Sequence, residues 1–572
     1  MQLNQIQKQI IEHDGNSIII GAPGTGKTLS MILRIKQLLA QGANPETIGV
    51  ACFTPKAASL TKSWLLKVLG QDAKRIKYGT FKDFAEAELK TTGSLVGEFA
   101  DNSQMRRLLH QAKRATGFKG SIHEAEHIVR SFKSKAKKPQ NTDEHYDLFS
   151  KYQDLIHNRN WYDRYDCLRQ HLISLRNDMA QPSRIKYLFV DNAQDMNQIQ
   201  LLWTLEHANS GIKVTLAADD DQCIFQRSGA MGSKVIDTVR EFEIRFEKFV
   251  LDTSYRLTNN LSEKAYKVVS LADQRISKGD VNTLNVETSI EVKQYNSKIQ
   301  EIEALISNIR HYFKNNVKGK VAVITRNDED ARFIAKFFLQ EGFPFTDFSR
   351  NIWEMPGSIV VIDMLEILLG VANDVVLKNV LSTLGLHSKT IDQLFSKGLT
   401  GQSWLQNGAT LDLSLVDEES ERKKVVKIQS LLVSYYALRV KLSIKDIFKA
   451  LCFEMMRTMS PEDKKDALCA IEKVLNFKGD IKENIDLIRK DRQLNPNSQL
   501  ILGPVREFRN LEFDVTHMPF CDLNTYPYDY KVLGKKNSSD RRIFFTALTR
   551  SKDAVYVSYS SPTPSSYLKY LQ

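Results

Sequence analysis

Apolar and polar positions follow two different rhythms along the first part of the chain. A short apolar run at residues 17–20 (Ser-Ile-Ile-Ile) precedes a helical pattern from residue 27 to about residue 40. A second apolar run at residues 48–53 precedes another helical pattern that begins near Lys56. Short apolar runs that alternate with helices are typical of parallel strands covered by helices, so this segment predicts a βαβ arrangement.

The same alternation returns later and is interrupted twice. Strand signals recur at residues 187–190 and 214–217, and a second α/β unit begins with the apolar run at residues 320–325. It closes with a helix start at residues 542–545 and a strand at residues 554–558. The intervening stretches look helical, so we predict an α/β fold with two units in tandem, each interrupted by a mainly helical insertion.

The expected boundaries follow from these changes of pattern. The first α/β unit is assigned to residues 1–90 and 180–250, its insertion to 91–179, the second unit to 251–364 and 491–572, and its insertion to 365–490.

Length, charge and cysteine usage restrict the class of protein. The 572 residues are too many for one hydrophobic core, and the net charge of +12 favours a polyanionic partner, either nucleic acid or an anionic membrane surface. Acidic residues interrupt the most apolar stretch, residues 358–377, which favours a buried strand and helix over a membrane span. No apolar leader follows Met1 and no CxxC pair is present, so we expect a cytoplasmic protein without zinc or an iron–sulfur cluster.

Positive charge is concentrated in the first helical insertion. The cluster consists of Arg106, Arg107, Lys113, Arg114, Lys119, Arg130, Lys133, Lys135, Lys137 and Lys138. A solvated helix face explains any one of these residues, whereas their density favours contacts with nucleic-acid phosphates.

A phosphate-binding loop is the strongest chemical signal. Residues 21–28 (Gly-Ala-Pro-Gly-Thr-Gly-Lys-Thr) match G-x-x-x-x-G-K-[ST] between a predicted strand and a predicted helix. The glycines let backbone N–H groups surround phosphate oxygens, and the helix N-terminus adds a favourable dipole. Lys27 is expected at the β- and γ-phosphates of ATP and Thr28 at Mg²⁺. The nucleotide contacts predicted in this segment are Gly21, Ala22, Pro23, Gly24, Thr25, Gly26, Lys27, Thr28 and Ser30.

Asp191 is the second predicted ligand of Mg²⁺. It ends the strand predicted at residues 187–190, where a carboxylate can hold the ion, usually through water. Aspartate is also a common turn residue at strand ends, but the Asn-Ala-Gln-Asp that follows favours the metal role.

A series of short motifs, in order along nearly the whole chain, resembles the UvrD/Rep/PcrA family of superfamily 1A DNA helicases. The matching segments are Leu3-Asn4 with Gln7 (Q motif), residues 53–58 (motif Ia), 79–81 (Ib), 191–195 (II), 219–225 (III), 255–256 (IV), 511–513 (V) and 546–550 (VI). Together the matches are specific, although one short match alone would mean little. The resemblance implies that the two α/β units are RecA-like P-loop domains.

The resemblance also implies roles for the matched residues. Gln7 would contact adenine, Tyr255 the base and Glu512 the ribose of ATP. The implied catalytic residues are Asp191, Asn192, Gln222, Arg256 and Arg550, with Arg256 at the γ-phosphate and Arg550 as an arginine finger. The implied contacts to single-stranded DNA are Phe53, Thr54, Lys56, Thr80, Phe81, Phe225 and Arg227.

These roles suggest how ATP would move DNA. Arg256 and Arg550 belong to the second unit and would meet a phosphate held by the first, so ATP would draw the units together and hydrolysis would release them. Phe81 and Phe225 could stack on bases without sequence preference. Core packing explains either ring equally well when the family is set aside.

Four positions depart from the family pattern. The motif II glutamate, which orients and deprotonates the attacking water, is Asn192, and such a base contributes about 10²–10⁴-fold. Asp195 is a carboxylate close by in sequence, with no indication that it reaches the water. The motif III Trp-Arg pair falls on Arg227-Ser228, and the motif IV asparagine is Ser254. The motif V glycine is Asn510, a residue that tolerates positive φ better than most.

Two classes of function remain open. The first is an ATP-dependent DNA helicase or translocase of the UvrD type that acts on single-stranded DNA or junctions, moves 3′ to 5′ by resemblance, and has impaired hydrolysis. The second is a helicase-like ATP- and DNA-binding switch that regulates a partner such as a nuclease, an arrangement that resembles the UvrD-like subunits of Gabija-type anti-phage defence. Asn192, Ser228 and Asn510 favour the switch, and the intact P-loop with Arg256 and Arg550 favours turnover. The motif Ia and Ib matches weigh against a P-loop protein that acts on proteins or membranes.

Overall fold

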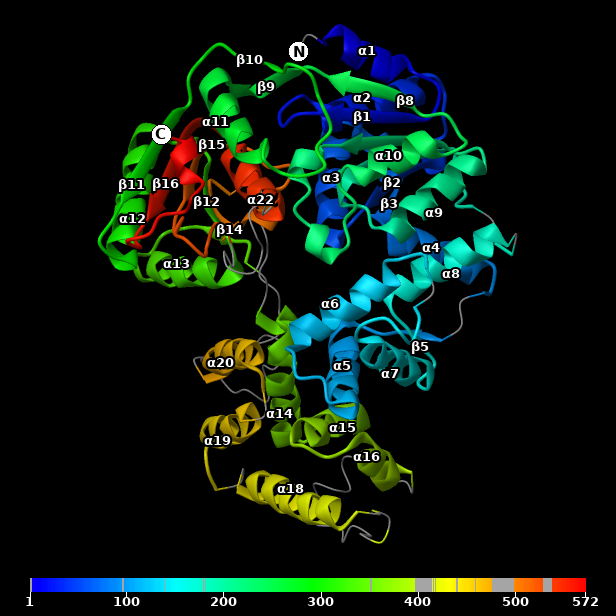
Figure 1. The fold of residues 1–572 in the computed structure, drawn as a ribbon, viewed down its shortest axis with the longest axis vertical. Coiled ribbons are helices and arrows are strands. Elements are labelled where there is room, and N and C mark those ends of the chain that lie inside the picture. Colours follow the sequence, from blue (N-terminus) through cyan, green and yellow to red (C-terminus); the bar gives the residue numbers. More distant parts are fainter. Residues whose placement is uncertain are drawn as a thin grey trace. The chain divides into compact units, whose positions relative to one another are not determined.

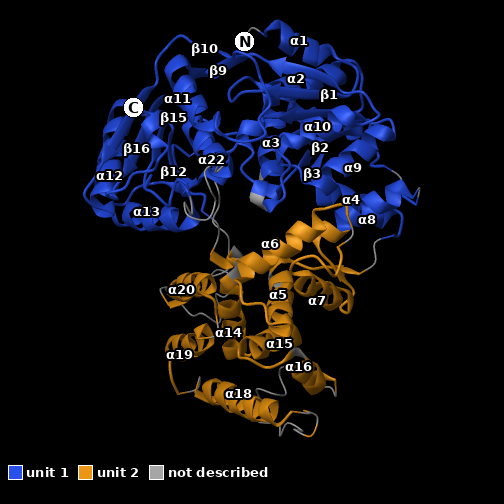
Figure 2. Ribbon diagram, in the orientation of Figure 1, with its two compact units in different colours: residues 1–95, 167–349, 493–572 blue, residues 96–166, 350–492 orange. Residues whose placement is uncertain are grey.

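The chain forms two compact units, which Figure 2 shows in different colours. Unit 1 comprises residues 1–95, 167–349 and 493–572, and unit 2 comprises residues 96–166 and 350–492. The structure, a computed structural model, describes residues 3–94, 97–137, 139–177, 179–180, 182–349, 352–396, 414, 416, 418–438, 441–457, 459–475, 498–527 and 538–572.

Unit 1 contains two parallel β-sheets. Within the described residues, the first sheet has six strands in the order β3-β2-β6-β7-β1-β8. Their bounds are β1 (Ser17–Gly21), β2 (Ile48–Cys52), β3 (Lys77–Thr80), β6 (Tyr187–Asp191), β7 (Lys213–Ala218) and β8 (Glu247–Leu251). Figure 1 labels β1, β2, β3 and β8 of this sheet. The helices of this part are α1 (Gln5–Glu12), α2 (Lys27–Ala40), α3 (Pro55–Leu69), α4 (Phe81–Thr91), most of α8 (Arg164–Arg176), α9 (Gln198–Asn209) and α10 (Lys234–Glu241).

The second sheet of unit 1 also has six strands among the described residues, in the order β11-β16-β15-β12-β14-β13. Their bounds are β11 (Ser289–Gln294), β12 (Val321–Thr325), β13 (Thr346–Asp347), β14 (Leu500–Pro504), β15 (Phe513–Met518) and β16 (Ser551–Tyr559). Its helices are α11 (Asn259–Val269), α12 (Lys298–Asn315), α13 (Asp328–Gln340) and α22 (Ser538–Leu548). A parallel pair, β9 (Thr253–Thr258) and β10 (Asn282–Leu284), lies between the two sheets along the chain.

The strand predictions are confirmed because the apolar runs are buried throughout. Strands β1, β2 and β12 have no exposed residue, as expected for parallel strands covered on both faces. The helix predicted from residue 27 to about 40 is α2, and the predicted fold class of two parallel α/β units in tandem is correct.

Unit 2 is mainly helical. It contains a short strand pair, β4 (Glu98–Phe99) with β5 (Trp161–Tyr162), and two groups of helices. The first group is α5 (Asn102–Thr116), α6 (Ile122–Lys133) and α7 (Tyr146–His157). The second is α14 (Ile359–Leu369), α15 (Asp374–Thr383), α16 (Ser388–Phe395), α18 (Glu419–Leu438), α19 (Ile444–Met456) and α20 (Pro461–Leu475). In the part of the chain that the structure describes, no helix combines the length and apolar character needed to cross a bilayer.

The prediction of a strand and a helix at residues 358–377 is wrong in its first half, because the structure has two helices, α14 and α15. Nearly every residue of α14 is buried, so the helix lacks a polar face. A helix that is apolar all round has no 3.6-residue period, and its sequence therefore cannot be told from that of a buried strand.

Part of the predicted phosphate-binding charge serves internal ion pairs of unit 2. Arg107 donates from Nε and Nη2 to Oδ1 of Asp363, at 2.9 and 2.7 Å, and Asn379 donates to the other carboxylate oxygen. Lys113 lies 3.7 Å from Asp463, which also accepts the backbone N–H of Ile122 at 3.1 Å. These contacts join the first helical group to the second, so the two insertions share one interface.

Lys133 is likewise structural. Its ammonium is buried and lies 2.6 Å from Asp163 and 2.7 Å from Asp166. Lys135 and Lys137 are exposed and stay candidates for phosphate contacts, while Lys138 lies outside the described residues. The expectation that the whole cluster faces a nucleic acid is therefore wrong for Arg107 and Lys133.

The Arg107–Asp363 pair generates a prediction about the stability of unit 2. Arg107→Met leaves a buried carboxylate without its cation, which should cost about 3–5 kcal/mol. Burial raises the pKa of Asp363 to about 6, with Arg107 opposing the rise. Without Arg107, the pKa of Asp363 should rise further, so at pH 5 the carboxyl of the variant is protonated and carries no buried charge. The loss of unfolding free energy should therefore be smaller at pH 5 than at pH 8. Calorimetric unfolding of the full chain at both pH values measures the difference.

The matched control is Lys423→Met, which removes an exposed pair with Glu419 at 2.9 Å. It should leave the unfolding transition almost unchanged, because exposed pairs contribute little. If both variants lose the same unfolding free energy at pH 5 and at pH 8, the Arg107–Asp363 pair stabilises unit 2 no more than an exposed pair does.

Candidate nucleotide-binding site

The P-loop connects β1 to α2 and is held in shape by the segment that carries motif IV. Gly24 and Gly26 have φ values of 80° and 85°, a region that favours glycine. A Cβ on Gly24 would lie 2.5 Å from the Cβ of Arg256. Ser254 Oγ donates to the carbonyl of Pro23 at 2.8 Å, and the Tyr255 N–H donates to that of Gly24 at 2.9 Å. Ser254, a departure from the family pattern, thus fixes the loop directly.

Lys27 occupies the centre of this loop. Its ammonium donates to the carbonyl oxygens of Gly21 and Ala22, at 2.8 and 2.9 Å, and lies 3.9 Å from Oδ2 of Asp219. Burial lowers the pKa of Lys27 to about 8, although Asp219 and Asp191 favour the charged form. A desolvated ammonium bonded mainly to neutral carbonyls has room for an anionic partner.

Three further predicted nucleotide contacts, Gln7, Thr25 and Ser30, form hydrogen bonds within the protein. Gln7 donates from Nε2 to the carbonyl of Thr25 at 3.3 Å and also closes the capping box of α1 with Asn4. Thr25 donates its hydroxyl to the carbonyl of Ala22 at 2.9 Å, and Ser30 donates to that of Gly26 at 3.0 Å. The hydroxyl of Ser30 is therefore used within the first turn of α2.

The two predicted Mg²⁺ ligands lie together. Thr28 Oγ1 donates to Oδ2 of Asp191 at 2.8 Å, at the point where α2 begins and β6 ends. Burial raises the pKa of the Asp191 carboxyl, against the opposing effects of Thr28 and Lys27. Asn192 follows in a left-handed conformation with φ 59°. A hydroxyl and a carboxylate are oxygen ligands of the kind that Mg²⁺ prefers, so the donor set fits this ion.

A chain of polar contacts runs from the first sheet to the second through Gln222. Its Nε2 donates to Oδ2 of Asp219 at 2.6 Å, and its Oε1 accepts from Nη2 of Arg550 at 2.5 Å. Arg256 lies 3.0 Å from Glu512, which also pairs with Lys552 at 3.0 Å. The residues predicted from motifs III, IV, V and VI therefore meet at one place, beside Lys27.

Three cations at this place are desolvated, and of these Arg256 is paired with a carboxylate, Glu512. Besides Lys27, the side chain of Arg550 is 2% exposed, and burial together with repulsion from Arg256 lowers its pKa to about 9. Burial also lowers the pKa of Arg256, and Glu512 opposes that effect. The three groups come from both sheets and would all gain from an anion placed among them.

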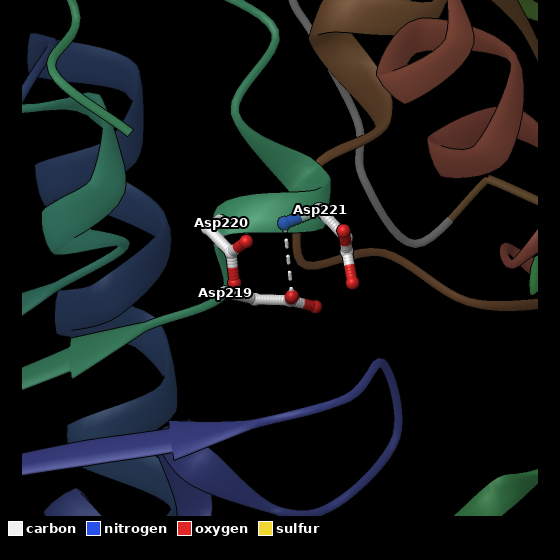
Figure 3. Close-up of side chains that lie close together, drawn as sticks. All are labelled: Asp219, Asp220 and Asp221. Atoms are coloured by element: carbon white, nitrogen blue, oxygen red, sulfur yellow. Dashed lines mark hydrogen bonds between the residues drawn. The ribbon is translucent and has the colours of Figure 1, made fainter. Parts of the chain in front are cut away.

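The acidic run of motif III carries a partner that the sequence did not identify. Figure 3 shows the carboxylates of Asp219, Asp220 and Asp221 close together. Lys278 lies 3.2, 2.7 and 2.6 Å from them, and Arg275 pairs with Asp221 at 2.6 Å. An ammonium thus occupies the position among the three carboxylates where a metal ion would have to bind. Three consecutive buried acids require cations, but the sequence does not reveal which ones.

Motif V brings a further residue that sequence reasoning missed. Arg509 contacts the carboxylate of Asp195 and lies 4.5 Å over the ring of Phe225. Asp195, considered as a substitute base, is therefore paired with a guanidinium. Asn510 has φ 59°, so the residue at the family's glycine position still adopts the left-handed conformation, and its side chain donates to Asp191 at 3.2 Å.

The predicted DNA-binding residues are less uniform. Phe81 is 2% exposed and packs against Trp203, with ring centroids 5.7 Å apart, so core packing describes it better than base stacking. Phe53 and Phe225 are partly buried. Thr54 and Thr80 are the N-caps of α3 and α4. The side chains of Lys56 and Arg227 lie outside what the structure describes.

The fold and the loop define a P-loop nucleotide-binding protein with two RecA-like domains, and comparison with known proteins identifies its family. Residues 3–243 match the UvrD/REP helicase N-terminal domain, and residues 249–394 match the UvrD-like helicase C-terminal domain. The chain therefore belongs to the UvrD/Rep family of superfamily 1A helicases.

Several curated relatives carry the name ATP-dependent DNA helicase Rep. The protein of Buchnera aphidicola subsp. Schizaphis graminum is 22% identical over an alignment of 619 positions, which covers 98% of this chain and 93% of the relative. That of B. aphidicola subsp. Acyrthosiphon pisum is 24% identical over 376 residues, 60% of this chain and 57% of the relative. That of Escherichia coli is 24% identical over 373 residues, 60% and 55% respectively. In the last two cases the match spans little more than half of the relative's length.

The P-loop geometry generates a prediction about nucleotide binding. Lys27→Ala removes a buried cation and should weaken ATP binding about 10- to 100-fold, the loss expected for a charge-assisted hydrogen bond. Because the pKa of Lys27 is lowered to about 8, the parent should lose affinity as the pH rises from 7 to 9. The variant should lack this fall. Isothermal titration calorimetry measures both.

The matched control is Lys36→Ala, which changes an exposed lysine of the same helix. It should bind ATP like the parent. Unchanged affinity in Lys27→Ala would remove the basis for placing phosphates in this loop.

Proposed function

We propose that the protein is an ATP-dependent translocase on single-stranded DNA, of the UvrD/Rep type, in which the hydrolysis step is slow. The observation that carries this proposal is the group of three desolvated cations, Lys27, Arg256 and Arg550, contributed by both sheets of unit 1. A triphosphate bound among them would supply the missing negative charge. Its release would remove the force that draws the two sheets together.

Each residue around the proposed phosphate position would have a separate role. Lys27 would bind the β- and γ-phosphates. Arg256, on β9, and Arg550, directly before β16, would stabilise charge on the γ-phosphate. Thr28 and Asp191 would hold Mg²⁺, which when bound neutralises charge that develops on the phosphate oxygens. Gln222 connects Asp219 to Arg550, so it would orient the finger arginine relative to the loop.

Slow hydrolysis is supported by the partners of the nearby carboxylates. Among the described residues of motifs II, III and V, each carboxylate other than Asp191 has a cation beside it. The pairs are Asp195 with Arg509, Asp219 and Asp220 with Lys278, Asp221 with Arg275 and Glu512 with Arg256. A paired carboxylate is a weak base, so none of these paired carboxylates is suited to replace the glutamate missing at Asn192.

Restoring that glutamate should raise the rate of ATP hydrolysis. Asn192→Glu places a carboxylate beside Asp191, with an upper limit of about 10²–10⁴-fold for a general base. Asn192→Gln is the matched control, because glutamine has the same length and the same backbone cost at φ 59° but cannot accept a proton. The measurement is steady-state ATPase with and without single-stranded DNA.

We expect the steady-state rate of ATP hydrolysis to be much higher in Asn192→Glu than in the parent or in Asn192→Gln. A parent that already turns over briskly would contradict slow hydrolysis and would leave the translocase assignment in place. A Glu variant that binds ATP without a gain in rate would shift the cause to Ser228 and Asn510.

Binding to single-stranded DNA should depend steeply on salt. The logarithm of the binding constant should fall by about 0.7 per phosphate contact for each decade of salt. Lys135→Ala with Lys137→Ala removes two exposed charges and should flatten the slope by about 1.4 if both contact phosphates. Fluorescence anisotropy with a labelled oligonucleotide at several salt concentrations gives the slopes.

Lys314→Ala with Lys318→Ala removes the same charge from exposed positions at the end of α12 and beyond it. This control should keep the parent slope. Equal slopes for all three proteins would exclude Lys135 and Lys137 from the DNA contact, and a flat slope in the parent would contradict DNA binding through a basic surface.

A further inference from the structure

Asn510 makes a contact that a glycine at this position could not make. Its backbone has φ 59°, which glycine would adopt at least as easily. The side-chain amide adds a hydrogen bond from Nδ2 to Oδ2 of Asp191, 3.2 Å long and 319 residues apart in the chain. What distinguishes asparagine here is therefore a link from motif V to the carboxylate predicted to hold Mg²⁺.

The same carboxylate oxygen already has another donor. Oδ2 of Asp191 accepts from Thr28 Oγ1 at 2.8 Å, and Oδ1 accepts from the Asn192 N–H at 2.9 Å. A carboxylate oxygen has about two lone-pair positions, so Thr28 and Asn510 together fill those of Oδ2. A hydrated metal ion that approaches Asp191 from the side of Thr28 needs one of them. Oδ1 has one position left, but at Oδ2, the oxygen that faces Thr28, the ion would compete with the amide of Asn510.

The residue before Asn510 extends the effect of such a displacement. Arg509 contacts Asp195 of motif II and covers the ring of Phe225 in motif III at 4.5 Å. Burial lowers the pKa of Arg509 to about 10, and Asp191 favours its charged form. Because Arg509 and Asn510 are adjacent, a movement of one at Asp191 is passed to the guanidinium that covers Phe225.

We propose that Asn510 is a positioning residue that senses Mg²⁺–nucleotide at Asp191. In the nucleotide-free protein its amide ties the motif V loop to Asp191. When Mg²⁺–ATP is bound at Thr28 and Asp191, the amide of Asn510 would give up its bond to Asp191, and this would loosen the loop and the cover that Arg509 forms over Phe225. This inference rests on the proposed binding of Mg²⁺–ATP at the P-loop, and it adds a route from the metal ligand to an aromatic side chain proposed to meet DNA.

Asn510→Gly tests the proposal because it keeps the backbone conformation and removes only the amide. A fluorescent, non-hydrolysable ATP analogue is titrated into the full chain, once with MgCl₂ and once with EDTA. With Mg²⁺ the variant should bind about two- to tenfold more tightly than the parent, since no hydrogen bond has to be broken. With EDTA the two proteins should bind equally, because the nucleotide alone does not compete for Asp191.

Asn524→Gly is the matched control. Asn524 is another asparagine of unit 1 with positive φ, 72°, and it is exposed. This variant should match the parent in both titrations. A second readout is the factor by which the Mg²⁺–analogue changes the affinity for a labelled single-stranded oligonucleotide. That factor should be closer to one in Asn510→Gly, because the loop is already released before nucleotide binds.

The outcomes separate this proposal from the proposed function. A parent that fails to bind the analogue with Mg²⁺ overturns both. A parent that binds, with an Asn510→Gly variant of equal Mg²⁺-dependent affinity, overturns only the role of Asn510. A gain of the same size in EDTA also overturns it, because a general loosening of the loop would not depend on the metal. An unchanged effect of nucleotide on DNA affinity refutes the link to Phe225.

Discussion

The amide of Gln222 is the interaction on which the arrangement of the site depends. It donates to Asp219 of the first sheet and accepts from Arg550 of the second, so one side chain fixes the distance between the P-loop region and the finger arginine. Lys278 balances the charge of the acidic run from the side of Oδ1 of Asp219, and Oδ2 accepts the bond from Gln222. An amide suits this position better than a charged group would, because it can donate to a carboxylate and accept from a guanidinium at once.

The parts of the fold that could be predicted are those encoded locally. The strands ending at Gly21 and Asp191 are short apolar runs beside turn residues, and the P-loop is a continuous pattern with a physical reason for each glycine. For Asn510, residue type indicates only that a positive φ is tolerated, and the structure shows that the residue adopts it. Where local pattern and burial disagree, as in α14, a continuous apolar run does not reveal its secondary structure.

The parts that could not be predicted are long-range partners of charged and aromatic residues. Lys133 belongs to a basic cluster in sequence but is neutralised by Asp163 and Asp166, and Arg509 pairs with an aspartate more than three hundred residues away. Phe81 matches a DNA-binding motif, yet its ring packs on Trp203. Sequence gives the type of chemistry available at each position, whereas the choice between solvent, ligand and internal partner is made by packing.

The shared interface of the two helical insertions bears on how the chain matures during synthesis. Arg107 is synthesised 256 residues before its partner Asp363, and Lys113 is likewise synthesised long before its partner Asp463. The first helical group therefore leaves the ribosome long before its counter-charges exist, and unit 2 cannot close until most of the chain has been made. Such non-local closure is slow and leaves apolar surface open in the meantime. A fragment that stops after the first α/β unit and its insertion would leave Arg107 and Lys113 without their counter-charges and would expose the apolar surface that the second helical group covers, so truncation at that boundary should give an aggregation-prone product.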